Sequence, residues 1–358
     1  MSENGGDHIE ERGPTEFRDP LVRQELKKAS IWYGIGLAIA AVIFLAQPLL
    51  LIFAGIVFAS VLDGGTRLLE RILPIGRGWR LAIVTLAGFG LIIGFVVYAG
   101  FELVAQAETL RIVVTEQINR MLVWANATGL TEGGIRFEQL GQQVMGTLGR
   151  LSSAVGSAAG AIASIIMVLV IGIFIAIEPR LYERGVAWML PIRSRQSFYT
   201  MSERMGWTLR RLMLGRLVGM AVEGIGTWLL LWLGGVPMAA LLGMITGLLA
   251  FIPNIGAIIS GLLMVTVGFS YSTDAGLWAI LVYLFVQNVD GYLIVPYVAR
   301  KTVDLAPAMV LGAQLLFGAL FGFMGLLLAD PIIAMIKTAL EHRSREKEAD
   351  EASVAAPG

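Results

Sequence analysis

Seven predominantly apolar stretches divide the chain, and most reach the roughly 20 residues that a helix needs to cross the hydrocarbon core of a bilayer. They occupy residues 31–62, 81–101, 151–177, 215–235, 237–269, 276–298 and 306–336. Charged residues make up only 15% of the chain, and no stretch shows the two-residue alternation of a strand. We therefore predict an all-α fold, a polytopic integral membrane bundle with broken or re-entrant helices and an extramembrane helical insert.

Three of these stretches, 31–62, 237–269 and 306–336, are too long for one ordinary crossing. The first carries Pro48 near its centre, and proline inside a helix removes a hydrogen-bond donor and clashes with the preceding turn. We expect residues 31–62 to form a hairpin of two short helices.

Basic residues set the expected topology, because short cytoplasmic loops are enriched in lysine and arginine. Both termini are predicted to lie in the cytoplasm, and the chain beyond about residue 345 is expected to be disordered. The expected divisions are a cytoplasmic tail (1–30), a first hairpin with a third membrane helix (31–101), an extramembrane amphipathic helical insert (102–150), a membrane helix (151–177), an arginine-rich cytoplasmic linker (178–214), a C-terminal transport core (215–337) and a charged cytoplasmic tail (338–358).

The composition argues against several classes of function. The chain has no cysteine, and its two histidines, His8 and His342, lie in the polar tails, so a metal site or a histidine-based triad is not expected. The net charge of zero gives no reason to expect a nucleic-acid partner. GxSxG, HExxH and phosphate-loop motifs are all missing, so we expect neither an enzyme nor a cofactor.

The segment FIPNIGAIISG (251–261) interrupts one of the most apolar stretches with Pro253, Asn254 and Gly256. Broken backbone survives at membrane depth only where protein buries it or where it lines a wet cavity. One interpretation is a solute path, and the other is a packing kink or a hairpin tip. The distribution of basic loops favours a hairpin tip at this segment.

Polar residues inside the apolar stretches supply the candidate contacts for a solute or an ion. The segment QNVDGYLIVP (287–296) contains Gln287, Asn288 and Asp290, and Glu223 lies seven residues after Arg216. A carboxylate within the membrane is a functional hypothesis by default. The alternatives are an interfacial cap or a packing contact for Asp290 and an ion pair within the bundle for Glu223.

Five further residues are assigned structural roles as hinges or helix caps. They are Pro296, Asp304, Pro307, Asp330 and Pro331. An acid followed directly by proline is typical of a helix start. This pattern occurs at residues 19–20, 178–179 and 330–331.

Residues 215–337 resemble the C-terminal half of the autoinducer-2 exporter family of bacterial membrane proteins, also called PerM-like permeases. The matching segments are FIPNIGAII (251–259), QNVDGYLIVP (287–296) and LAPAMVLGAQLLFGALFGFMGLLLADP (305–331), in the family's order and spacing. Three positions depart from the pattern: Ala257 stands where proline is usual, Asp290 where glutamate is usual, and Ala306 where histidine often precedes the proline.

The resemblance implies a multi-span transporter of the bacterial inner membrane that forms homo-oligomers. Some members of the family are associated with export of the furanone autoinducer-2, and others are similar to sodium or lithium/proton antiporters. The first hypothesis is a secondary exporter of a small polar solute, with Pro253, Asn254 and Gly256 shaping the site and Gln287, Asn288 and Asp290 contacting the solute. The alternatives are a Na⁺(Li⁺)/H⁺ antiporter using Asp290 or Glu223, and a non-transport membrane scaffold acting through residues 102–150.

Overall fold

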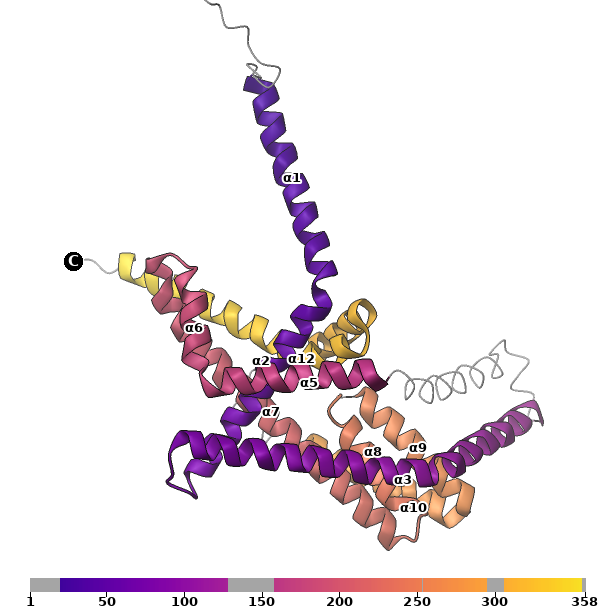
Figure 1. Cartoon of the computed structure of the whole chain (residues 1–358). Coiled ribbons are helices and arrows are strands. Elements are labelled where there is room, and N and C mark those ends of the chain that lie inside the picture. The colour runs from indigo at the N-terminus through magenta and orange to yellow at the C-terminus, as the bar shows by residue number, and fades with distance from the viewer. Residues whose placement is uncertain (1–19, 128–157, 253, 295–305, 356–358) are drawn as a thin grey trace, which may run out of the picture. The chain divides into compact units, whose positions relative to one another are not determined.

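The computed structural model describes residues 20–127, 158–252, 254–294 and 306–355, and all regular secondary structure in these ranges is helical (Figure 1). This confirms the all-α prediction. The helices are α1 (Pro20–Phe44), α2 (Ala46–Glu70), α3 (Arg77–Ala127), α5 (Ala158–Ile177), α6 (Pro179–Trp188), α7 (Ile192–Leu233), α8 (Ala239–Leu249), α9 (Ile255–Tyr271), α10 (Thr273–Val289), the π-helix η2 (Asp290–Ile294) and α12 (Pro307–Ala355).

The first long apolar stretch is broken at Leu45, three residues before Pro48. The helices on either side, α1 and α2, are each 25 residues long. The predicted pair of short helices is therefore wrong: α1 extends the stretch by 11 residues before its predicted start at 31. Residues 1–49 form a compact unit separate from residues 50–358, and the two units are described separately.

Four helices in the described residues are long and apolar enough to cross a membrane: α2, the first part of α3 (Arg77–Gly94), α7 and α12. The pair α5 and α6 is a further candidate, and it bends by 87° at Glu178. Glu178 is the N-cap of α6 and Pro179 its first residue, as predicted, although the Glu178 side chain makes no capping hydrogen bond. Pro20 and Pro307 likewise begin helices.

Helix α3 does not end at the predicted boundary between a membrane helix and an insert at residue 101. It continues without a break to Ala127 and is 51 residues long, or about 76 Å. The rest of the predicted insert, from residue 128 to 150, lies outside the described residues. The predicted linker 178–214 is also helical, since it contains α6 and the first half of α7.

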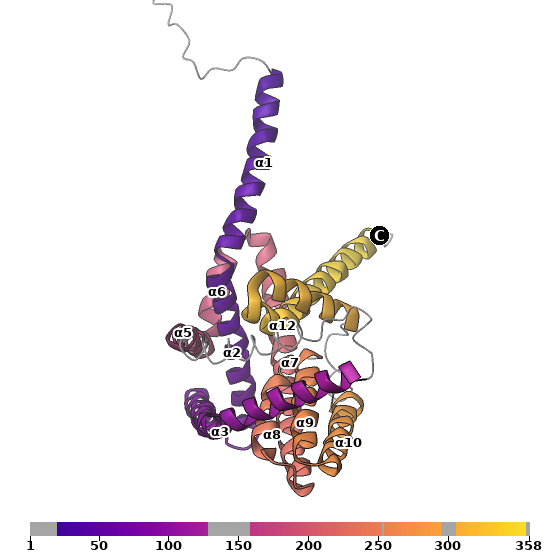
Figure 2. The same ribbon diagram turned by 90° about the vertical axis from the view of Figure 1, so that its right-hand side faces the viewer.

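Helices α7 to α10 form an antiparallel group, gathered together in Figure 2. Gly224 of α7 lies against Gly243 and Gly247 of α8. At this contact the two backbones approach closely because there is no side chain between them. On α10, the Trp278 indole nitrogen donates a 2.8 Å hydrogen bond to the Leu230 carbonyl of α7.

The contacts of α9 establish its direction relative to the other three helices. Gly268 of α9 lies against Ala275, and Gly261 against Tyr283 of α10. Consequently α9 runs parallel to α7 and antiparallel to α8. The chain therefore turns back between α8 and α9.

The lengths of α8 and α9 fit a re-entrant hairpin. They contain 11 and 17 residues, which is about 16 Å and about 25 Å, less than the roughly 30 Å of a bilayer core. Asn254 adopts a positive φ of 62° at the turn. Gly256 is buried against the end of α8, and a Cβ atom added there would clash with the Leu249 carbonyl oxygen.

Replacing Gly256 by alanine is expected to destabilise the protein by about 1–3 kcal/mol, because the methyl group has to displace backbone atoms of α8. The thermal unfolding of the purified protein in detergent measures this. Gly226→Ala is the control, because no atom lies within 4 Å of its added Cβ and alanine favours a helix by about 0.5–1 kcal/mol. Equal effects of the two substitutions would contradict the close turn.

Helix α12 is not straight, because Gly322 has φ 64° and ψ −146°, a conformation that L side chains rarely adopt. Gly325 lies against the Phe317 carbonyl, and Gln314 contacts Asp330. These pairs are centred on Gly322, so the two arms of α12 fold back on each other.

Asp330 and Pro331 therefore do not begin a helix, and the prediction of a cap there is wrong. The sequence permits a helix start at this place, but the chain instead breaks eight residues earlier at glycine. The expected disorder beyond about residue 345 is also wrong, since α12 remains helical to Ala355. An (i, i+4) ion pair joins Lys347 to Glu351 in this part.

Candidate functional site

One face of α7 carries three polar residues and a glycine at helical spacing. Arg216, Gly219, Glu223 and Thr227 are separated by three, four and four residues and lie on a single stripe. Glu223 is 6% exposed and Thr227 is fully buried. Among the described residues, the Thr227 hydroxyl has no hydrogen-bond partner. This stripe is the foundation of the candidate site.

Asp290 lies against this stripe. Helix α10 passes into the π-helix η2 at Asp290, and such π segments are frequent at functional sites because they redirect side chains. A Cβ atom added to Gly219 would lie 3.6 Å from Asp290 Oδ1. The absence of a side chain at Gly219 thus leaves room for the carboxylate.

Glu223 and Asp290 are close enough for their charges to interact, and each also interacts with Arg216. In the described part of the chain, however, neither carboxylate is joined to a basic side chain by an ion pair. The Asp290 carboxylate of η2 thus lies against the α7 stripe that carries the Glu223 carboxylate. Such a pair is suited to hold a proton or a cation between them.

The guanidinium of Arg216 forms an ion pair with Asp330 of α12. Asp330 Oδ1 also accepts a 3.1 Å hydrogen bond from the side-chain nitrogen of Gln314, on the other arm of the same helix. Asp330 and Gln314 are 6% and 1% exposed. In the described residues the Gln314 side-chain oxygen has no hydrogen-bond partner. The folded α12 is therefore tied to α7 through a buried polar cluster.

Among the described residues, the charges of this region do not balance. Arg216 is the basic residue that interacts with Glu223, Asp290 and Asp330 there. Three carboxylates around one guanidinium leave an excess of negative charge in this part of the described chain, and two of them, Glu223 and Asp330, are buried. Burying an unpaired charge is costly, so this arrangement favours uptake of a proton or a small cation.

Other residues predicted from the sequence lie on the last turn of α10 and at the α8–α9 turn. Gln287 is half-buried on the last turn of α10, whereas Asn288 is exposed and donates a 2.6 Å hydrogen bond to the Leu284 carbonyl of its own helix. Asn254 is exposed at the α8–α9 turn, and its side chain makes no capping hydrogen bond. Pro253, Pro296 and Asp304 lie outside the described residues.

Three residues of the site did not emerge from the sequence: Thr227, Gln314 and Asp330 as the partner of Arg216. Gln314 stands alone in the apolar run 307–329, and a lone amide in such a run is a sign that could have indicated it. The pairing of Asp330 with Arg216 joins residues 114 apart. The packing of α12 against α7 brings them together.

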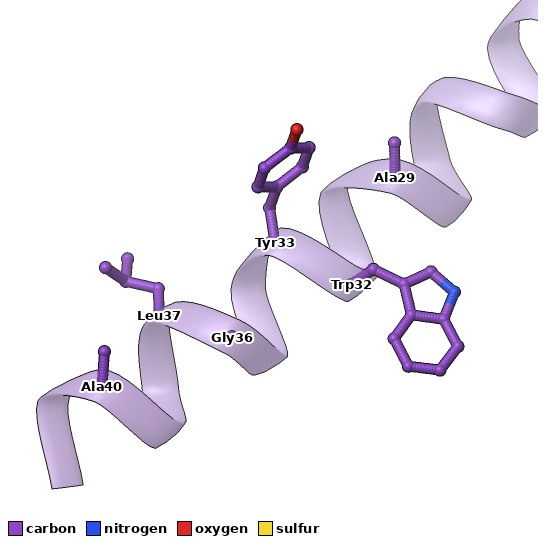
Figure 3. A pocket seen from close by; sticks show the side chains of 6 residues that line it. All are labelled: Ala29, Trp32, Tyr33, Gly36, Leu37 and Ala40. Carbon is purple, nitrogen blue, oxygen red and sulfur yellow. The ribbon is translucent and has the colours of Figure 1, made fainter. Parts of the chain in front are cut away.

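A hollow on α1 is lined by Ala29, Trp32, Tyr33, Gly36, Leu37 and Ala40. Figure 3 shows that all six residues belong to one helix, with both aromatic rings projecting away from it. Trp32 and Tyr33 are 73% and 81% exposed and lie where the apolar part of the helix begins. Exposed tryptophan and tyrosine at the start of an apolar segment are typical of the membrane–water interface. No group of three or more histidine, aspartate or glutamate side chains in the described ranges could hold a metal ion.

Comparisons with known proteins agree with these features. The model of the family described as "AI-2E family transporter" matches residues 33–345. "Putative transport protein YueF" of Bacillus subtilis is 28% identical over 149 residues, which cover 42% of this chain and 40% of that protein. "Putative permease PerM" of Escherichia coli K12 is 30% identical over 128 residues, 35% of this chain and 36% of that protein.

The aligned regions thus span about two fifths or less of the length of these curated relatives. The family model, by contrast, covers most of the chain. The apolar helices agree with the membrane location that the family requires. The chain belongs to the AI-2E family of transporters and is a multi-pass membrane protein.

Proposed function

We propose that this transporter is a secondary exporter of a small polar solute, and that the carboxylates of Glu223 and Asp290 couple export to the movement of a proton or cation. The observation that carries the proposal is the position of Asp290 against Gly219, between Arg216 and Glu223 on the α7 stripe. Neither carboxylate is paired with a basic side chain among the described residues. Both are therefore available to exchange a proton for a cation.

Two interrupted segments support a path for the solute beside these carboxylates. The Met220 carbonyl of α7 lies against Gly247 of α8, two residues before α8 ends, so the α8–α9 turn is near the level of Gly219. The second interruption, at Gly322, brings Gln314 to Asp330, which forms the ion pair with Arg216. Paired broken helices are a recurring feature of transporter binding sites.

The solute class follows from the side chains and the family. Gln287 and Gln314 offer amide groups for a neutral polar molecule, so an autoinducer-2-like signalling molecule fits the proposal. We also propose that the protein lies in a bacterial inner membrane with both termini in the cytoplasm and that it forms a homo-oligomer. The relatives are named only as a transport protein and a permease.

A second candidate is a Na⁺(Li⁺)/H⁺ antiporter without an organic solute. The observation in its favour is the excess of carboxylates in the described ranges, where Glu223, Asp290 and Asp330 all interact with Arg216. In this reading Asp290 or Glu223 alternates between its protonated and cation-bound forms.

Everted membrane vesicles that contain the protein distinguish the two candidates. The exporter is expected to accumulate labelled autoinducer-2 in the vesicles when a proton or sodium gradient is imposed. The antiporter is expected to change the internal pH on addition of Na⁺ or Li⁺ without any organic solute. Vesicles that show neither response, although the protein is present and folded, would refute both.

Gly219 offers a structural test of the site. Gly219→Ala is expected to retain transport within about twofold, because its methyl group would be in ordinary contact, 3.6 Å from Asp290 Oδ1. Gly219→Leu is expected to reduce transport by about tenfold, because the longer side chain has to displace the carboxylate. The measurement is the initial rate of flux. Gly226→Leu, on the same helix where no atom lies within 4 Å of the added Cβ, is the control and should leave the rate unchanged.

A further inference from the structure

We propose that Asp63, Arg67, Arg77 and Arg210 form a binding site for the phosphate of an anionic lipid headgroup. This group, called here the headgroup cluster, joins α2, α3 and α7 at the membrane boundary. It is separate from the α7 stripe described above, and it does not depend on the identity of the transported solute.

The cluster is organised around the carboxylate of Asp63. Arg67 Nε donates to Asp63 Oδ2 at 3.0 Å, and Arg210 Nη1 lies 3.2 Å from the same oxygen. Arg77 Nη2 is 3.4 Å from Asp63 Oδ1 and donates a 3.1 Å hydrogen bond to the Ala176 carbonyl. Three guanidinium groups from three helices thus converge on one acid.

Within the described residues, this arrangement has more cationic N–H donors than acceptors, so donors remain to bind an anion. Arginine has five N–H donors, and Asp63 and the Ala176 carbonyl accept only a few of those available. The side chains of Arg67 and Arg77 are 63% and 46% exposed, whereas Asp63 is 18% exposed. Arg210 is less exposed and also interacts with Glu183 and Glu203. The uncompensated positive charge therefore resides on Arg67 and Arg77, at the surface.

The position of the cluster fits the headgroup layer. Helix α2 ends at Glu70, α3 begins at Arg77 and α5 ends at Ile177. Three candidate membrane helices thus have their ends here. After α5 the chain bends by 87° into α6, which exposes Trp188, and an exposed tryptophan is typical of the membrane interface.

The chemistry of the cluster selects a phosphate group. A guanidinium group can bind phosphate through two parallel N–H···O bonds. Arg67 and Arg77 approach Asp63 from different helices, so a phosphate bound here could accept hydrogen bonds from both. Basic pockets between membrane helices on the cytoplasmic side bind anionic lipid headgroups. A lipid phosphodiester is favoured over free phosphate because the bilayer holds it at this depth.

The test uses the full-length protein, purified in detergent and stripped of lipid, with added phosphatidylglycerol, phosphatidylcholine or inorganic phosphate. Phosphatidylglycerol is expected to raise the thermal unfolding temperature in a saturable way, and phosphatidylcholine is not. The double variant Arg67→Gln/Arg77→Gln should weaken the apparent affinity for phosphatidylglycerol by about tenfold to thirtyfold, at about 1 kcal/mol for each basic residue. Arg193→Gln, an exposed residue of α7 outside the cluster, should leave the affinity unchanged.

Asp63→Asn separates a binding site from a purely structural ion-pair cluster. Removing the competing carboxylate should keep or strengthen the affinity for phosphatidylglycerol if the arginines bind phosphate. Loss of the lipid response in Asp63→Asn, or an equal response of the double arginine variant and the wild type, would overturn the proposal. Competition by inorganic phosphate that depends on Arg67 and Arg77 would support the phosphate site and identify a free anion as a ligand. Equal stabilisation by phosphatidylcholine and phosphatidylglycerol would refute it.

Discussion

Replacing Asp290 by asparagine is expected to reduce cation-dependent flux by about thirtyfold to a hundredfold. Asparagine has nearly the same shape but cannot exchange a proton, and a lost contact with a charged group costs about 2–3 kcal/mol. Glu223→Gln should have a similar effect, because the two carboxylates interact with each other and with Arg216. The measurement is sodium- or proton-driven flux in everted vesicles, normalised to the amount of protein.

Asp274→Asn is the matched control for this prediction. Asp274 lies in the first turn of α10, at the opposite end of the helix from Asp290, and is exposed. Its loss should leave the flux within about twofold. If Glu223 and Asp290 act as one unit, the double variant should be no slower than either single variant. Full flux in Asp290→Asn would remove Asp290 from the transport mechanism.

Replacing Arg216 by methionine is expected to destabilise the protein by about 3 kcal/mol or more. The substitution leaves Asp330 buried at 6% exposure without the guanidinium that pairs with it, and breaking a buried ion pair by removing one partner typically costs about 3–5 kcal/mol. Glu223 and Asp290 also lose the positive charge with which they interact. Thermal unfolding in detergent, compared at matched lipid content, measures the loss.

Asp330→Asn is expected to cost less than Arg216→Met, because Arg216 keeps two neighbouring acids, Glu223 and Asp290. Asparagine at position 330 also keeps an oxygen for the Gln314 amide. The double variant Arg216→Met/Asp330→Asn should recover part of the stability lost in Arg216→Met, since it removes the unpaired acid. Arg193→Met, on the exposed start of α7, should change the stability by no more than about 0.5 kcal/mol. An equal loss in all three single variants would argue against the buried ion pair.

Composition and the spacing of apolar residues were sufficient to predict the class of fold. The turn at residues 250–254 also followed from sequence, since proline, asparagine and glycine favour a chain reversal and the basic loops required one. The second reversal, at Gly322, could not be predicted in the same way. Gly318, Gly322 and Gly325 all lie in one apolar run, and nothing local shows which of them adopts a positive φ.

Local sequence contrast indicates part of the candidate site. Glu223, Gln287 and Asp290 are polar residues in apolar helices, and this contrast makes them candidates from sequence. Asn288 is a candidate for the same reason, and in the structure its amide is bonded to its own helix. The connection from Arg216 to Asp330 and Gln314 depends on tertiary contacts between α7 and the two arms of α12, which no local pattern specifies.

The unbroken course of α3 has a mechanical consequence. A helix that continues from Arg77 to Ala127 without a turn transmits a rotation of one end to the other as a rigid lever. Val113 of this helix packs against the buried core formed by α7 to α10, and the part beyond it is about 21 Å long. A tilt of about 10° about Val113 would therefore move Ala127 sideways by about 4 Å. Any movement of α8 and α9, which contact α3, would thus be passed on to the far end of the helix.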